Sequence, residues 1–126
     1  ESASSYYDSN YLPLGSHSSL EYTVVTGNVT IPATARVGDT GTAYTENRYA
    51  DATKASFLGT TTYTYRLEAD TATTALVRIV GLEQDSTGAS TGSTETLRYR
   101  ITPAGAATPI SETLVDSDGT MVFTYN

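Results

Sequence analysis

The sequence predicts an antiparallel all-β domain of about eight strands, joined in a meander of hairpins. Three observations lead to this class. Apolar and polar residues alternate over most of the chain; threonine is the most frequent residue and tyrosine is abundant; and Gly, Asp, Ser or Pro stands at each break. A chain of 126 residues has room for one core. We therefore expect a single domain, built either as a sandwich or as a small barrel or half-barrel.

The predicted strands are residues 20–24, 29–37, 42–49, 60–68, 75–83, 94–102, 110–115 and 120–125. In the first, Leu20, Tyr22 and Val24 share one face, and Glu21 and Thr23 share the other. A tight turn over residues 26–28 should link it to the second as a hairpin.

The predicted strand over residues 29–37 alternates from Val29 to Val37 but contains Pro32. Proline has no N–H to give to a ladder. This strand should therefore lie at a sheet edge or carry a bulge at that residue.

The predicted strand over residues 75–83 is the one that is apolar on both faces, from Leu76 to Val80. Such a strand is expected at the centre of the fold, covered on both sides. Arg78 interrupts the run, so its guanidinium should reach the rim of the sheet or pair with a carboxylate such as Glu68 or Glu95.

Two connections are longer than a tight turn. Residues 50–59 are long enough for one helical turn over residues 51–57, whereas residues 84–93 are polar and should form a flexible tip. No stretch has sustained helical periodicity. The strong turn sequence at residues 116–119 (Asp-Ser-Asp-Gly) separates the last two strands.

The chain opens on small polar residues, Glu1-Ser2-Ala3-Ser4-Ser5, without an initiator Met. We interpret residues 1–15 as a flexible tether and residues 16–126 as the single β domain. The opening fits a processed or trimmed chain from which an upstream signal peptide or lipid anchor has been removed.

Charge and cysteine content narrow the function classes. The formal net charge is −7, which opposes binding to nucleic acid and to anionic membrane surfaces. No apolar run is long enough to span a bilayer. The absence of cysteine excludes disulfides, thiolate metal sites and cysteine nucleophiles, and fits a bacterial exported protein. No cofactor is predicted.

The segment Tyr11-Leu12-Pro13-Leu14, followed by Leu20-Glu21-Tyr22, resembles the opening of bacterial envelope lipoprotein-like β domains. Those domains begin Tyr-Phe-Pro-Leu and continue through a glycine to Trp-x-Tyr. Here Leu20 stands at the tryptophan position and His17 at the glycine position. The resemblance implies an extracytoplasmic location, in the periplasm, at the cell surface or secreted, and assigns no residue a role.

Two motifs resemble functional sites. His17 is the only histidine, between Ser16 and Ser18 and near Asp8, but neighbours on an extended chain point to opposite faces and do not form a Ser-His-Asp relay. Residues 116–119 resemble part of a calcium loop, but no bidentate glutamate follows, so a β-turn is favoured. We predict no catalytic, cofactor or metal residue.

Paired carboxylates could support glycoside hydrolysis. The glutamates near strands are Glu21, Glu46, Glu68, Glu83, Glu95 and Glu112. Most are expected to point outward and to form cross-strand pairs with Arg66, Arg78, Arg98 and Arg100. The aspartates at predicted bends, Asp39, Asp51, Asp70 and Asp85, should stabilise turns.

The abundant tyrosines suit sugar stacking and protein interfaces, and are also ordinary half-buried strand residues. Three functional hypotheses follow. The leading one is a non-enzymatic extracytoplasmic module that binds a protein or a glycan. The second is a barrel-like carrier of a small apolar ligand with inward residues such as Val24, Ile31, Tyr65 and Leu97, and the third is a small hydrolase.

Overall fold

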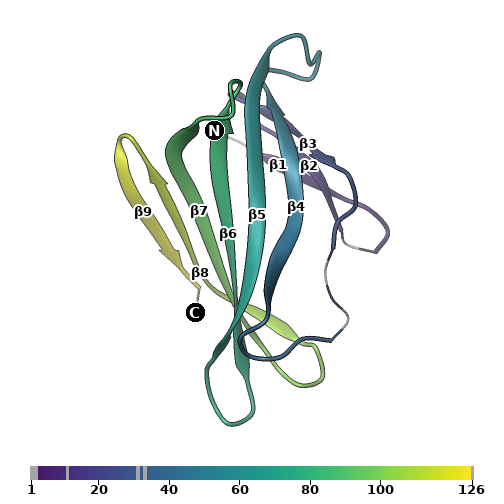
Figure 1. Cartoon of the computed structure of the whole chain (residues 1–126), viewed down its shortest axis with the longest axis vertical. Coiled ribbons are helices and arrows are strands. Elements are labelled where there is room, and N and C mark those ends of the chain that lie inside the picture. Colours follow the sequence, from purple (N-terminus) through teal and green to yellow (C-terminus); the bar gives the residue numbers. More distant parts are fainter. Residues whose placement is uncertain (1–2, 11, 31, 33, 126) are drawn as a thin grey trace.

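The chain forms one curled antiparallel sheet of nine strands in a computed structural model that describes residues 3–10, 12–30, 32 and 34–125 (Figure 1). The strands are β1 (Ser4–Tyr7), β2 (Pro13–His17), β3 (Tyr22–Thr26), β4 (Thr40–Tyr49), β5 (Phe57–Ala69), β6 (Ala75–Asp85), β7 (Ser90–Ile101), β8 (Ala107–Asp116) and β9 (Gly119–Thr124). Each pairs with its neighbours in sequence, and β1 and β9 form the two edges. The all-β class is confirmed, in its half-barrel form.

The pairing register of β5, β6 and β7, which is regular through their central residues, determines which side chains share a face. Tyr65 lies opposite Ile79, and Ile79 opposite Leu97, so one row of apolar side chains crosses β5, β6 and β7. Because successive residues point to opposite sides, Arg66 and its cross-strand neighbours lie on the other surface. The sheet therefore has a concave face, which encloses the interior of the half-barrel, and a convex outer face.

The predicted strand over residues 29–37 is wrong for the residues that the structure describes; Ile31 and Ala33 lie outside them. The segment is a connection, and β3 pairs directly with β4, with Tyr22 opposite Tyr49. One ladder-like bond remains, from the Thr30 N–H to the Ala43 carbonyl at 2.7 Å. Pro32 cannot donate to a ladder, whereas β4 contains no proline and satisfies β3 along its length.

The sheet begins before residue 16, because β1 and β2 pair as a hairpin and β2 continues into β3 through the pair His17–Tyr22. The predicted boundary between tether and domain thus falls within β2. Among the described residues there is no helix that could span a lipid bilayer.

Both long connections are tighter than predicted. Residues 51–56 form a turn and no helix, and Phe57 already begins β5. The Lys54 N–H donates to the Asp51 carbonyl, and Lys54 has a positive φ of 59°, where a helix would stop. The stretch over residues 84–93 is largely strand, because β6 extends to Asp85 and β7 starts at Ser90. Its tip is ordered by Asp85, whose carboxylate accepts bonds from the N–H groups of Thr87 and Ala89.

Strand β6 lies between β5 and β7, as expected for a central strand, but it is not covered on both sides. The described residues form a single sheet without a second layer, so Leu82 on the convex face is 50% exposed. In the described part of the chain, Ala43 and Leu67 are the only buried apolar side chains. Arg78 contacts Glu68 at 3.7 Å, one of its two predicted partners.

Candidate functional site: the concave groove

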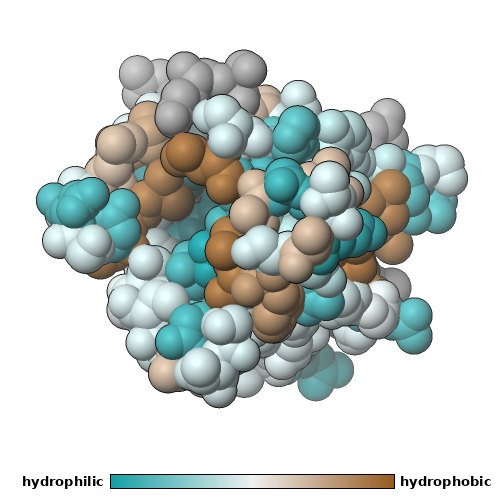
Figure 2. All heavy atoms as spheres, turned by 90° about the horizontal axis from the view of Figure 1, so that it is seen from above, coloured by the Kyte–Doolittle hydropathy of each residue, from teal (hydrophilic) through white to brown (hydrophobic). Residues whose placement is uncertain are grey.

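The concave face contains a groove of about 340 Å³ and an adjoining hollow of about 200 Å³. Four residues line both and mark their meeting point: Ser16, Glu46, Tyr63 and Glu95. Figure 2 looks into the half-barrel from above and shows hydrophobic and hydrophilic atoms around the same opening. This interior is therefore a mixed surface and differs from the dry core of a closed barrel.

Tyr63 occupies the centre of the site because Gly81 lies opposite it on β6. A Cβ atom on Gly81 would come within 2.7 Å of the Tyr63 ring, so only glycine lets the ring lie flat over the strand. The other face of the ring stacks on Tyr44, with ring centroids 4.6 Å apart. The Tyr63 hydroxyl donates to the Glu95 carboxylate at 2.9 Å.

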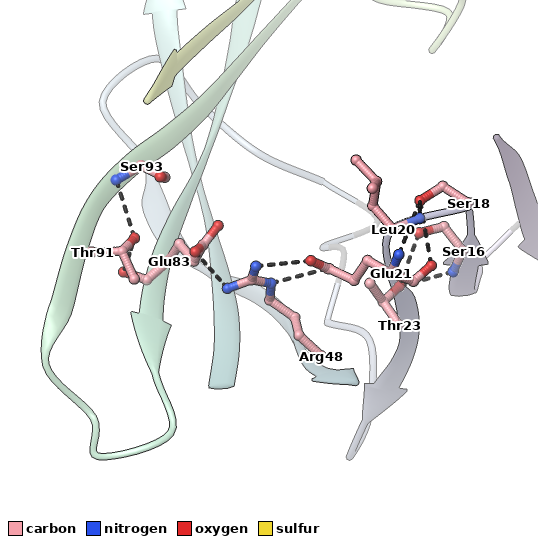
Figure 3. Close-up of polar contacts among 9 residues, drawn as sticks. All are labelled: Ser16, Ser18, Leu20, Glu21, Thr23, Arg48, Glu83, Thr91 and Ser93. Carbon is pink, nitrogen blue, oxygen red and sulfur yellow. Dashed lines mark hydrogen bonds and ion pairs between the residues drawn. The ribbon is translucent and has the colours of Figure 1, made fainter. Parts of the chain in front are cut away.

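Arg48 on β4 joins two carboxylates at the end of the groove, as Figure 3 shows. Its Nε and Nη2 donate to the two oxygens of Glu21 at 2.9 and 2.8 Å, and its Nη1 lies 2.6 Å from Glu83. Burial alone would lower the pKa of Arg48, but its bonds to Glu21 and Glu83 raise it overall. The guanidinium is thus paired with two acids and stays charged.

Among the residues that the structure describes, Glu46 and Glu95 form no ion pair, and the charge of Arg48 only weakly offsets the effects that raise the pKa of Glu46. Glu46 is 8% exposed. Burial raises its pKa, the charge of Glu95 raises it further, and a hydrogen bond from Thr23 partly offsets this. Burial also raises the pKa of Glu95, against the bond from Tyr63. The same burial, with these carboxylates nearby, raises the pKa of Tyr63 and of Tyr44, which remain neutral donors.

The groove is therefore strongly acidic. Its lining includes Glu21, Glu46, Glu83, Glu95 and Asp116 against a single guanidinium, Arg48. Hydroxyl groups of Ser16, Thr23, Thr61 and Ser93 stand between them. Such a surface can accept hydrogen bonds from a ligand's O–H and N–H groups at many points, and it repels anions.

The expectation that most strand glutamates point outward is wrong for five of the six. Glu21, Glu46, Glu83 and Glu95 line the groove, whereas Glu68 contacts Arg78 on the convex face. Glu112 lies opposite Leu97 and therefore shares the concave face, where it accepts a bond from the Tyr125 hydroxyl at a more exposed position. The half-barrel is open, so carboxylates on its concave side keep access to water. Glutamates can therefore occupy the inner face, which in a closed barrel would be apolar.

Only some of the residues predicted to point inward in an apolar carrier lie on the concave face. Leu97 lines the second hollow, and Tyr65 shares its face. Val24 points the other way, since its neighbour Thr23 lines the groove, and Ile31 lies outside the described residues. In β3 the polar face over Glu21 and Thr23 is thus the inner one, the reverse of what its alternation indicates.

The residues around His17 and the turn at residues 116–119, which resembled a catalytic relay and a calcium loop, have structural contacts instead. The His17 ring packs edge-on against Tyr22, the Ser16 hydroxyl bonds Thr23, and Asp8 accepts the N–H groups of Asn10 and Leu12. They form no relay. Asp116 accepts the N–H groups of Asp118 and Gly119 and closes the β8–β9 turn.

Aspartates at bends stabilise turns as predicted. Asp39 accepts the Arg36 N–H, Asp51 the Thr53 N–H, and Asp70 the Thr74 hydroxyl. No group of three His, Cys, Asp or Glu side chains suited to a metal ion occurs in the part of the chain that the structure describes.

Sequence reasoning missed Arg48, Thr23 and Gly81 as parts of the site. One signal was available: an isolated glycine in a strand pattern, such as Gly81, often marks a close approach. No known family model, curated protein or solved structure is significantly similar to this chain.

Proposed function

We propose that this protein is an extracytoplasmic binding module whose concave groove holds a neutral or amine-bearing glycan. The observation behind the proposal is the lining of the groove and its adjoining hollow, where Tyr44, stacked on Tyr63, lies near carboxylates and hydroxyls. Aromatic faces pack against the C–H faces of sugar rings, and carboxylates accept bonds from sugar hydroxyls. The cysteine-free composition and the resemblance of the N-terminal segment favour an exported protein.

A glycan suits this groove better than the other ligand classes considered. An extended peptide gains most of its affinity by adding a strand at a free edge, but the groove floor is formed by paired inner strands. An apolar ligand would bury Glu46 and Glu95 without hydrogen-bond partners from solvent, at a cost of several kcal/mol. An anionic sugar would be repelled by the acidic lining.

The test is calorimetric titration with three tetrasaccharides of equal length. One consists of β-1,4-linked glucose, one of β-1,4-linked glucosamine, and one of α-1,4-linked galacturonic acid. The first two should bind and the acidic one should not. Tyr44→Ala should weaken binding about tenfold, the value of one good aromatic contact. Tyr49→Ala is the matched control, because Tyr49 lies on the same strand but packs against Phe57 away from the groove.

Equal losses in the two variants would contradict a groove site, and binding of the acidic sugar alone would contradict the electrostatic argument. Absence of binding by all three would reject the proposed function.

The pair Glu46 and Glu95 favours a second candidate, glycoside hydrolysis. Both line the same part of the groove, and both have a raised pKa, which suits a general acid. A hydrolase needs one protonated and one ionised carboxyl. If the protein cleaves the tetrasaccharides that it binds, new reducing ends should appear, and Glu95→Gln should abolish them while leaving binding intact.

A further inference from the structure

Three arginines on neighbouring central strands lie directly opposite one another on the convex face. Arg66 on β5 pairs in register with Arg78 on β6, and Arg78 pairs with Arg98 on β7. We call these three residues the arginine row. The row continues in register to Thr40 at one end and Ser111 at the other, so hydroxyls flank it.

The row is short of negative charge. Like charges directly opposite in a sheet destabilise it, and the acid–base pairing expected for these strands is replaced by arginine against arginine. Its only ion pair among the described residues is the contact of Arg78 with Glu68 at 3.7 Å, which is too long for a hydrogen bond. The Nε atom of Arg78 is buried and has no hydrogen-bond partner within the described part of the chain.

Arg100 provides the contrast within the same protein. It lies on the same face, two residues beyond Arg98, but its Nε donates to Asp70 at 2.7 Å and its Nη2 donates to the other oxygen of that carboxylate. Arg100 therefore has the acid partner that the row lacks.

We propose that the arginine row binds one phosphate-sized or sulfate-sized oxyanion group. Guanidinium groups bind tetrahedral oxyanions through paired N–H donors, and neighbouring strands about 4.8 Å apart allow several arginines to reach one group. A single group fits better than an extended polyanion, because the net charge of −7 repels long anionic chains. This site lies on the face opposite the groove and is independent of the glycan proposal.

The test is a titration followed through the side-chain Nε–H signals of the arginines in ¹H–¹⁵N spectra. Inorganic phosphate and glucose 6-phosphate are the two probes, with sodium chloride at matched ionic strength as the reference. The signals of Arg66, Arg78 and Arg98 should shift and saturate with a phosphate probe, and that of Arg100 should not. If both probes shift the signals, the phosphate group alone is sufficient for binding. If only glucose 6-phosphate shifts them, the ligand is a phosphorylated sugar.

Arg78→Gln should weaken phosphate binding about tenfold or more, as expected for losing a charged hydrogen-bond donor. Arg100→Gln removes the same charge from the same face and should leave binding unchanged. The proposal is overturned if chloride produces the same shifts, if the two variants lose binding equally, or if a sulfated polysaccharide binds while both small probes fail.

Discussion

At the scale of single residues, the site is governed by how few counter-charges the groove contains. Arg48 takes two of the acids, and Tyr63 and Thr23 give the remaining pair, Glu95 and Glu46, only neutral donors. A neutral donor stabilises a buried carboxylate less than a cation does. The ionised forms of Glu46 and Glu95 are therefore energetically unfavourable in the folded protein. Replacing either residue by a neutral one should increase the free energy of unfolding.

Replacing Glu46 by Gln should stabilise the protein at pH 7 and have little effect at pH 3.5. The folded-state pKa of Glu46 is raised above 4.5, its ordinary value, chiefly because the carboxyl is buried. The folded protein therefore holds a proton that the unfolded chain has lost, and stability falls as pH rises from the ordinary pKa through the raised one. Above that window the wild type contains an unfavourable charge that the amide lacks.

Urea unfolding at the two pH values measures this effect. Glu68→Gln is the control, because Glu68 faces outward beside Arg78. A variant at Glu46 that is less stable than wild type at pH 7 would show that the carboxylate is well compensated in the groove.

Gly81→Ala, which adds one methyl group, should lower the free energy of unfolding by about 1–3 kcal/mol, as overpacking usually does. The new Cβ would lie 2.7 Å from the Tyr63 ring, which is held from its other face by Tyr44. The ring must move, and the bond from its hydroxyl to Glu95 should break.

A double-mutant cycle tests this cause. In a Tyr63→Ala background, Gly81→Ala should lower the free energy of unfolding much less than it does in the wild type, because the ring is then absent. A cost that persists there would mean that the strand itself, and not the ring, rejects the side chain.

At the scale of strands, β6 should be among the strongest elements and the tip between β6 and β7 among the weakest. Ile79 lies in the apolar row between Tyr65 and Leu97, so Ile79→Ala should cost about 2 kcal/mol, the low end for a large-to-small change because the sheet is covered on one face only. Thr87→Ala removes one exposed hydroxyl bond to Asp85 and should cost about 0.5 kcal/mol. Similar urea midpoints for both variants would contradict the central place of Ile79.

The strands that could be predicted from sequence are those whose alternation is uninterrupted. Over β5 to β9 the expected and observed elements agree within a few residues, and the turn at Asp116 is as expected. The stretch from Val29 to Val37 shows the limit of that reasoning, because alternation alone does not reveal whether a partner strand is free. There β4 already occupies the edge of β3.

The site was harder to predict than the strands, because alternation identifies two faces without telling which one is inside. In a closed core the apolar face would be the inner one, and β3 would have been read correctly. The open half-barrel turns Glu21 and Thr23 inward instead. Polarity at the inner face depends on water access, which is a property of the whole sheet.

At the scale of the whole molecule, the net charge of −7 conceals a separation of charge between the two faces. The concave groove gathers glutamates around Arg48, and the convex face bears the arginine row. The negative charge therefore opposes anionic ligands in the groove and extended polyanions, whereas a small anion on the outer surface meets the arginines first.

The unbroken meander also determines how the protein should respond to tension. Every strand pairs only with its neighbours in sequence, and the outermost strands β1 and β9 lead directly to the two ends of the chain. A force applied between the ends would load the backbone bonds of an edge strand one after another instead of all at once. We expect the molecule to open by peeling from its edges, in several small steps at low force, and to begin losing the groove lining when the peeling reaches β2 or β8.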